Sequence, residues 1–227
     1  MEAPSSPAFY SPVVVTGAGG RLGRLVAERL VAAGVLVAAL DRTEPAIDGA
    51  RGVAADLADE RSTADAFDLV ERDLGTPRAL VHTVGMWDGG PFAETTLEAW
   101  EAVLRTNLTS AFVCTREAVR RMRAAGVGGA VVGIASAQGA DRGVAQQAAY
   151  SASKAGVVRL VEAVAAEHGP DGIAAVAVAP SLLLFGDEPA GTPGVAAADV
   201  AALCVRLCGP DALVHAGATL RAYGSAG

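Results

Sequence analysis

The segment YSASK, near the start of an expected helix, holds two residues that could move a proton, Tyr150 and Lys154. They are four positions apart, so a helix brings both side chains to one face. A phenol with a pKa of about 10 is a poor base at neutral pH, but a neighbouring ammonium favours the phenolate and lowers that pKa. Upstream, Ser136 in GIASAQG ends an expected strand, where its hydroxyl could polarise a carbonyl. The three residues predict proton exchange at a carbonyl or alcohol oxygen.

A glycine-rich segment, TGAGGRLG, lies between the first apolar run of the chain and the first segment of helical periodicity. The start of a helix offers free N–H groups and a positive dipole end to a phosphate. Gly17, Gly20 and Gly23 would let the backbone turn tightly and approach the ligand closely. An ordinary glycine turn is the alternative, but the strand–turn–helix setting favours a site for pyrophosphate.

Asp41 ends the second apolar run, about 20 residues after the glycine segment, where an acid can bind both hydroxyls of an adenosine ribose. The same carboxylate would repel the additional phosphate of NADP, so NAD is the expected cofactor and NADP remains possible. Arg42 leaves this choice open, because its guanidinium could stack on adenine or bind that phosphate.

Apolar runs alternate with segments of helical periodicity along the chain. The expected strands cover residues 13–15, 35–40, 79–84, 130–134 and 173–178, with a weaker one at 218–222. The expected helices cover 22–33, 62–73, 97–125, 149–167 and 198–207. Strands that are apolar throughout are buried on both faces, as in a parallel sheet. The pattern predicts an α/β fold, a single-domain Rossmann-type doubly wound parallel sheet flanked by helices.

The domain is expected to cover residues 13–227, which suits one full-sized core. Residues 1–12, MEAPSSPAFYSP, form an expected flexible N-terminal arm, rich in Pro and Ser and without the regions of a signal peptide. The Gly- and Pro-rich residues 186–194 are expected to form a surface loop.

The composition of the chain limits the kinds of partner that the protein is expected to bind. The net charge of −7 argues against nucleic acid, and the arginines between residues 105 and 123 are expected to form a solvated helix face. No apolar run approaches the roughly 20 residues of a membrane span. Three cysteines give no disulfide framework, and neither they nor the histidines form a metal cluster. The expected location is the cytoplasm.

Taken in this order and on these elements, the glycine segment, Ser136 and YSASK resemble the short-chain dehydrogenase/reductase family. The resemblance extends from residue 13 to about residue 224 and implies an NAD(P)(H)-dependent oxidoreductase that interconverts a secondary alcohol and a ketone, similar to a 3-oxoacyl reductase. RTNLTS is similar to the family's asparagine segment. The implied catalytic residues are therefore Asn107, which would hold a proton-relaying water, Ser136, Tyr150 as acid/base, and Lys154.

The resemblance also implies which residues bind the cofactor. Lys154 would bind the nicotinamide ribose, and Asp56, followed by Leu57, would lie near the adenine. The full implied set is Gly17, Gly19, Gly20, Arg21, Leu22, Gly23, Asp41, Arg42, Asp56, Leu57, Thr83, Val84, Gly85, Tyr150, Lys154, Pro180 and Leu183.

Three departures from the family's motifs stand out. Arg21 occupies the position of the middle glycine in TGxxxGxG, so the segment has the atypical spacing TGxxGxxG. HTVG replaces NNAG, so Thr83 stands for an asparagine that ties the sheet together, although a hydroxyl can still make one such hydrogen bond. His82 is interpreted as a structural histidine, with an additional catalytic role as the alternative. PSLLLF replaces PGxVxT, so Phe185 stands where a hydroxyl would bind the nicotinamide carboxamide.

Only a short lid, SLLLFGDEPAGTPGV, separates Pro180 from the last expected helix. With Leu184 and Met86, it suggests an open, largely apolar substrate pocket, suited to an acyl, cyclic or polyketide-like ketone. The residues assigned to this pocket are Trp87, Gln138, Leu182 and Phe185.

Two further expectations concern what the protein does and how it assembles. The altered HTVG and PSLLLF segments leave open a dinucleotide-binding regulatory or scaffold protein with little turnover.

The helices at 106–125 and 149–167 carry apolar residues on more than one stripe. In the family that the chain resembles, such helices pair into a bundle, which implies a homotetramer or at least a homodimer.

Overall fold

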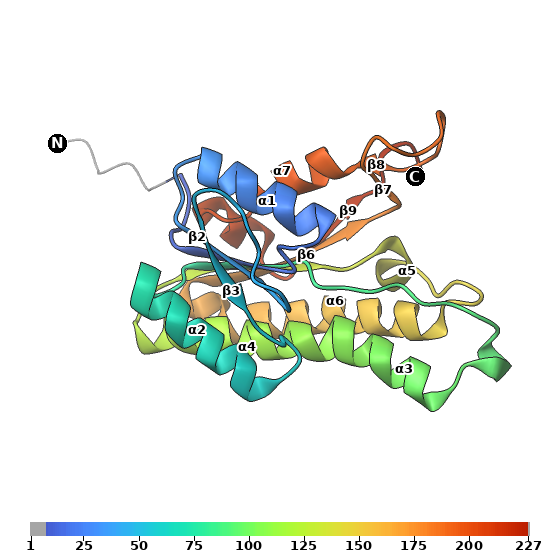
Figure 1. The fold of residues 1–227 in the computed structure, drawn as a ribbon, viewed down its shortest axis with the longest axis horizontal. Coiled ribbons are helices and arrows are strands. Elements are labelled where there is room, and N and C mark those ends of the chain that lie inside the picture. The colour runs from blue at the N-terminus through green and yellow to red at the C-terminus, as the bar shows by residue number, and fades with distance from the viewer. Residues whose placement is uncertain (1–7, 227) are drawn as a thin grey trace.

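The computed structural model describes residues 8–226, and Figure 1 shows their arrangement as a sheet between two layers of helices. The predicted N-terminal arm falls partly outside these residues. Within them, however, the Tyr10 side chain is buried in the core, and its backbone N–H donates to the carbonyl oxygen of Cys208 at 2.7 Å. The prediction of a loose arm over residues 1–12 is therefore wrong for Tyr10 and its neighbours, because the Tyr10 ring packs in the apolar core.

Seven parallel strands form the central sheet in the order β3-β2-β1-β4-β5-β6-β9. Their bounds are β1 Val13–Thr16, β2 Val37–Asp41, β3 Ala50–Ala54, β4 Ala79–His82, β5 Gly129–Ile134, β6 Ile173–Pro180 and β9 Thr219–Ala222. In the register, Val13 of β1 lies between Val37 of β2 and Ala79 of β4. The central strands are buried along their whole length, as the uninterrupted apolar runs predicted. The predicted doubly wound parallel sheet is confirmed.

Helices cover both faces of the sheet, and successive residues of a strand alternate between the two cores. Val13 and Val15 pack with α1 and α7, whereas Val14 packs with α2, α4 and α6. Figure 1 shows the first pair above the sheet and the other three below it. The helix bounds are α1 Arg21–Ala32, α2 Glu60–Leu74, α3 Leu97–Leu104, α4 Ser110–Ala124, α5 Ala137–Ala140, α6 Ala148–His168 and α7 Ala197–Arg206, with short 3₁₀ segments at Phe92–Glu94, Gly169–Asp171, Pro210–His215 and Gly224–Ala226.

The long helix predicted over residues 97–125 is interrupted. Between α3 and α4, residues Arg105–Thr109 form a π-helical segment, and the Asn107 side chain is buried within it. π-Helical turns are rare and occur frequently at functional sites. Periodicity could not predict this segment, because one widened turn barely changes the spacing of apolar residues.

Two further elements differ from the sequence prediction. Strand β3 was missed because Arg51 and Gly52 break its apolar pattern, although it pairs along its length with β2. The loop predicted at 186–194 is flanked by a pair of two-residue strands, β7 Leu183–Leu184 and β8 Val195–Ala196. These strands close the base of the segment, which is called the lid below and comprises residues 182–196.

Candidate active site

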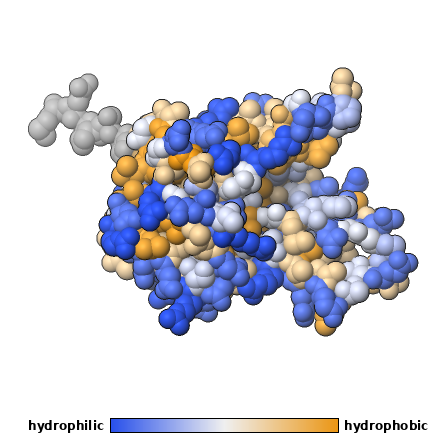
Figure 2. Space-filling view, viewed as in Figure 1, coloured by the Kyte–Doolittle hydropathy of each residue, from blue (hydrophilic) through white to orange (hydrophobic). Residues whose placement is uncertain are grey.

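The order of the strands reverses between β1 and β4, and the carboxyl ends of both strands border one hollow of about 380 Å³. Ligands of open α/β sheets bind at such a switch point. Figure 2 shows the surface indented between the part that carries the lid and the part that carries α3. The hollow is lined by Gly17, Gly20, Asp41, Arg42, Asp56, Leu57, Ala58, Thr83, Val84, Gly85, Met86, Thr106 and Ser110.

The glycine segment packs tightly against the ends of β1 and β4. Gly17 has a φ of +75°, which favours glycine, and a Cβ atom on Gly23 would lie 2.3 Å from the Gly17 carbonyl oxygen. The Thr83 hydroxyl donates to the carbonyl oxygen of Thr16 at 2.8 Å. Thr83 therefore links the two strands with a hydrogen bond, as expected for a hydroxyl at this position. Leu22 is buried beneath the segment, and Gly19, Gly20 and Arg21 are exposed at the hollow's rim.

Asp41, the last residue of β2, lies beside the glycine segment. One of its carboxylate oxygens accepts a hydrogen bond from the Gly19 N–H at 2.9 Å, and the other accepts from the Arg42 N–H at 2.7 Å. These two bonds fix the carboxylate at the end of β2. Asp41 and Arg42 both line the hollow.

Asp56 and Leu57 follow β3, and both line the hollow next to Asp41. The Asp56 carboxylate accepts hydrogen bonds from the Ala58 N–H and from the Arg105 guanidinium, each at 3.0 Å. These partners, with the Ala58 N–H foremost, hold the pKa of Asp56 below its usual value. Asp56 is thus a fixed negative charge, and Leu57 is buried beneath it.

Lys154 is the only lysine in the chain, and its side chain is buried on α6. Its ammonium donates to the carbonyl oxygen of Ile134 at 2.9 Å. Burial lowers the pKa of Lys154 to about 8. An ammonium has three donors, and Ile134 is the one hydrogen-bond acceptor found for it among residues 8–226. The remaining donors fit a hydroxyl-bearing ligand, and Gly85 leaves space there, since a Cβ on it would lie 3.1 Å from Nζ.

Tyr150 lies one turn before Lys154 on α6, and Ser136 lies two residues after the end of β5, directly before α5. Burial raises the pKa of Tyr150, and its interaction with the Ser136 hydroxyl opposes that rise. The expectation that Lys154 lowers this pKa is wrong in the structure, because burial has the larger effect and Ser136 is the group that opposes it. The Lys154 ammonium donates to Ile134 instead. The Ser136 hydroxyl itself donates to the side-chain oxygen of Gln138.

Asn107 is held by both ends of its amide. Its side-chain oxygen accepts from the Met86 N–H at 2.7 Å, and its NH2 group donates to the Met86 carbonyl at 3.0 Å and to the Ser153 hydroxyl at 2.9 Å. Both amide protons are therefore used, and the side chain ties the π-helical segment to the segment that follows β4 and to α6. Any water that Asn107 holds must bind to an acceptor oxygen of this residue.

His82 belongs to a buried network behind the hollow. Its Nδ1 lies 2.8 Å from the Thr16 hydroxyl and its Nε2 lies 3.2 Å from the Ser110 hydroxyl, which donates to the Thr106 carbonyl. Because Ser110 gives its proton to Thr106, Nε2 carries the imidazole proton and Nδ1 accepts. Burial lowers the pKa of His82 to about 3. The histidine is neutral and hydrogen-bonded, as the structural interpretation predicted.

The predicted substrate-pocket residues do not form one group. Trp87 and Leu182 are exposed, and Gln138 lies beside Ser136. The Phe185 ring lies under the Arg21 guanidinium at the glycine segment, and its assignment to the substrate pocket stays a prediction. Pro180 is buried at the end of β6, and Leu183 packs against the core.

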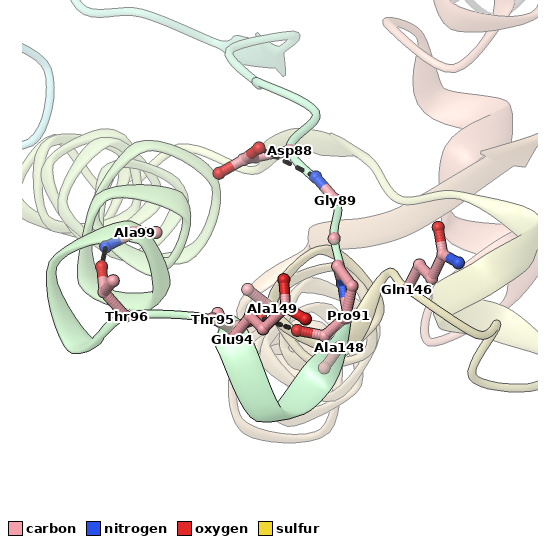
Figure 3. Close-up of a pocket in the computed structure, with 11 residues that line it drawn as sticks. Asp88, Gly89, Pro91, Glu94, Thr95, Thr96, Ala99, Gln146, Ala148 and Ala149 are labelled. Carbon is pink, nitrogen blue, oxygen red and sulfur yellow. Dashed lines mark hydrogen bonds between the residues drawn. The ribbon is translucent and has the colours of Figure 1, made fainter.

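A second hollow, of about 240 Å³, lies beside the start of α6 (Figure 3). Ala148 and Ala149, which precede Tyr150, border it together with the segment from Asp88 to Ala99. The Gly90 N–H donates to the Gln146 carbonyl at 2.8 Å and so ties that segment to the start of α6. Asp88 and Glu94 place carboxylates at this hollow. It lies next to the first residues of α6, the helix that also carries Tyr150.

Comparison with known proteins agrees with this geometry. Residues 11–184 match the family described as short chain dehydrogenase. The chain belongs to this family. A nicotinamide dinucleotide fits the residues present, because the glycine segment and Asp41 border the hollow at the switch point. The Lys154 ammonium lies next to Gly85, which also lines this hollow. This short-chain dehydrogenase is therefore an oxidoreductase that interconverts a secondary alcohol and a ketone with a nicotinamide dinucleotide.

Relatives and solved structures extend the comparison. The chain is 36% identical to cis-4-hydroxycyclohexanecarboxylate dehydrogenase of Sinomonas cyclohexanicum, over 83% of this chain and 79% of the relative. It is 34% identical to D-threitol dehydrogenase of Mycolicibacterium smegmatis (75% and 69%) and 34% identical to 3-oxoacyl-[acyl-carrier-protein] reductase of Mycobacterium avium (78% and 69%). Aldohexose dehydrogenase of Thermoplasma acidophilum has the same fold, with a TM-score of 0.86 at 21% identity over 97% of this chain and 95% of that chain. These names give no support to the binding-only alternative.

Some residues of the site could not be predicted from motifs. Ser153, Ser110 and Thr106 hold Asn107 and His82, and Asp187 of the lid binds Arg21. A signal existed only for Ser153, which lies inside YSASK. Within residues 8–226 no group of side chains is placed to hold a metal ion, and no helix is long and apolar enough to cross a membrane.

Proposed function

We propose that this short-chain dehydrogenase is an NAD(H)-dependent enzyme in which Tyr150 is the acid/base. The observation that carries this proposal is that Tyr150 interacts with Ser136, while Lys154, one turn along α6, lies next to Gly85 at the hollow of the switch point. A nicotinamide dinucleotide, when bound, supplies or accepts the hydride. Tyr150 gives a proton to the substrate oxygen during reduction of a ketone and takes it back during oxidation of the alcohol.

Ser136 and Gln138 orient the substrate oxygen in this proposal. The Ser136 hydroxyl has one proton, which Gln138 accepts in the structure. When a carbonyl oxygen takes the place of Gln138 as acceptor, the hydroxyl polarises it and holds it beside the Tyr150 phenol. Gln138 then turns to the substrate with a free amide, which makes it a determinant of substrate choice.

Lys154 and Asn107 support the proton transfer. Lys154 fixes α6 against the end of β5 through its bond to Ile134, so that Tyr150 stays beside Ser136, and its free donors bind the nicotinamide ribose. Asn107 keeps the π-helical segment at a fixed distance from α6 through its bond to Ser153 at 2.9 Å. Its remaining acceptor sites hold the water that relays the proton to solvent.

NAD is the proposed cofactor rather than NADP. The Asp41 carboxylate is fixed by the N–H groups of Gly19 and Arg42, so it cannot turn away from a ribose 2′-phosphate. Two negative charges at close range cost several kcal/mol. Arg42 is exposed and extends from the same strand end, and its attraction for that phosphate is the smaller effect.

The proposed substrate is a small ketone or alcohol that is not attached to a carrier protein. Residues 87–104, next to the hollow in Figure 3, include Asp88, Glu94, Glu98 and Glu101 and no lysine or arginine. Such a face would repel an acidic carrier protein. Its exposed Trp87 and Phe92 would instead contact a ring or an apolar chain. The relatives named for cyclic and polyol alcohols accord with this class.

We also propose a homotetramer, or at least a homodimer, located in the cytoplasm. A hollow of about 440 Å³ between α4 and α6 is lined by Phe112, Val119, Leu160 and Val164, which a second copy of these helices would cover. The three cysteines are free and buried, which suits a reducing compartment.

A substrate screen tests the proposal. Purified protein is mixed with NADH or NADPH and a panel of cyclic ketones, ketoses, linear ketones and carrier-bound 3-oxoacyl groups, and the loss of absorbance at 340 nm is followed. We expect turnover with NADH and at least one free ketone, and little with carrier-bound groups. Binding of NADH without turnover of any compound would contradict the proposed function.

A further inference from the structure

Two positions at which the sequence departs from the family's motifs contact each other in the structure. Arg21 replaces a glycine of the dinucleotide loop, and Phe185 replaces a threonine of the segment after β6. The Arg21 guanidinium carbon lies 3.9 Å from the centre of the Phe185 ring. Guanidinium groups at this distance from an aromatic face are attracted by the ring's quadrupole. The two replacements therefore act as a pair.

The same guanidinium has a second partner in the lid. Arg21 donates to the Asp187 carboxylate at 2.8 Å. The turn that presents both partners is fixed by Glu188, whose carboxylate accepts hydrogen bonds from the N–H groups of Phe185 and Gly186 at 2.9–3.0 Å. One arginine thus holds a ring and a carboxylate that a short, internally bonded turn places side by side.

The base of the lid is fixed independently of Arg21. The β7 and β8 strands pair there, and the Val195 N–H donates to the Leu182 carbonyl at 2.9 Å. The tip, residues 185–188, has Arg21 as its contact with the glycine segment. Arg21 is the first residue of α1 and directly follows Gly20, which lines the hollow at the switch point. The contact therefore lies at the edge of the proposed dinucleotide site.

We propose that Arg21 is a positioning residue that seats the tip of the lid on the glycine segment and thereby slows release of the bound dinucleotide. Only the effect on release of the dinucleotide rests on the proposed function; the seating of the lid tip does not. The family's motif implies a hydroxyl at position 185 that would bind the nicotinamide. Here Phe185 contacts Arg21 instead, which joins two parts of the protein. An exposed ion pair contributes little by itself, so the effect depends on the ring and the carboxylate acting on one guanidinium.

The test combines two readouts on the full-length protein. Hydrogen exchange of peptides covering 182–196, at short labelling times and without added nucleotide, measures how firmly the tip is seated. Stopped-flow displacement of NADH measures its release. The variants are Arg21→Ala, Phe185→Ala, the double variant and Arg21→Lys, which keeps the charge but loses the planar stack. Arg24→Ala is the matched control, because Arg24 lies on the same helix and pairs with Glu28 instead of the lid.

We expect faster exchange at the tip in both single variants, and NADH release about three- to tenfold faster, with the double variant no faster than Arg21→Ala. Arg21→Lys should resemble Arg21→Ala, and Arg24→Ala should match the unaltered protein. Unchanged exchange in Arg21→Ala, or faster exchange without faster release, would overturn the inference. If the unaltered protein binds no NADH, the proposed function fails, and the exchange measurement still decides whether Arg21 seats the lid.

Discussion

The Lys154 ammonium donates a hydrogen bond to the carbonyl oxygen of Ile134, 2.9 Å away and two residues before Ser136. This bond fixes α6 against the end of β5, so the helix that carries Tyr150 and the strand that precedes Ser136 keep one relative position. The most buried charged group of the site therefore orients the other two residues before any ligand arrives. A buried cation opposes folding, and the site tolerates this cost at the position where a cation is needed.

Lys154 should titrate near pH 8. Because it is the only lysine, protein labelled with ¹³C-lysine gives one side-chain signal, and its shift against pH reports this pKa directly. An unfolded lysine has a pKa of about 10.4, so between pH 8 and 10.4 the unfolded chain binds more protons. The buried Lys154 ammonium therefore destabilises the folded protein fully below pH 8, and this destabilisation is relieved as the pH rises through this window.

Comparison with Lys154→Met isolates that effect. The free energy of unfolding of the unaltered protein should rise relative to the variant by at most about 3 kcal/mol between pH 8 and 10.4. Groups common to both proteins cancel in the difference. A lysine signal that titrates near 10.4 would show that burial does not depress this pKa.

His82 should make the protein sensitive to acid. Its folded pKa of about 3 lies below the value of about 6.5 in an unfolded chain, so the unfolded chain binds more protons between these values. The contribution of neutral His82 to the free energy of unfolding is fully present above pH 6.5. It falls as the pH is lowered toward 3, by about 2 kcal/mol at pH 5. Urea unfolding at pH 7 and pH 5 should show this loss for the unaltered protein and a smaller loss for His82→Asn, and equal losses would refute it.

Asp41→Ala should move the cofactor preference toward NADP. Removal of the fixed carboxylate ends its repulsion of the 2′-phosphate and leaves Arg42 to bind that group, so the ratio of kcat/KM for NADPH to that for NADH should rise about tenfold or more. Asp48→Ala, which removes an exposed acid outside the hollow, is the control. If the unaltered protein already prefers NADPH, then Arg42 governs the choice and the account of this strand end is wrong.

Phe112→Glu should weaken self-association. Phe112 is 45% exposed on α4 and borders the hollow shared with α6, which apolar side chains and Arg116, Arg120 and Arg123 line together. A carboxylate there would have to be buried against the partner copy, which is unfavourable. Light scattering at micromolar concentration should give a tetramer or dimer for the unaltered protein and for the control Val214→Glu, and a smaller species for Phe112→Glu. A monomer mass for the unaltered protein would exclude the proposed assembly.

The central strands and the order of the motifs could be predicted from the sequence, because buried parallel strands leave uninterrupted apolar runs such as 13–15 and 173–178. Strand β3 could not, since an edge strand that is only partly buried tolerates Arg51 and Gly52. The π-helical turn at 105–109 could not either, because its cause is tertiary: the Asn107 amide is held by Met86 and Ser153 from two other elements.

The candidate site, too, could be predicted from the sequence only in part. Residue types and spacing were enough to predict that Tyr150, Lys154 and Ser136 belong together, because two of them lie on one helix and the third follows a neighbouring strand. Phe185 was assigned to the substrate because the motif alone says what a residue replaces and nothing about what it contacts. Its partner, Arg21, is remote in sequence, and only the folded chain brings the two together.

Tyr150→Phe tests the central claim most directly. The change removes one hydroxyl from a ring that remains packed, so NADH binding and thermal stability should barely change. With a substrate found in the screen, single-turnover oxidation of NADH should slow about a hundred- to ten-thousandfold, because the positioned proton donor is lost. Binding and turnover measured on the same samples separate the two steps. A variant that binds NADH and still reduces the ketone at the rate of the unaltered protein would contradict the assignment of Tyr150 as the acid/base.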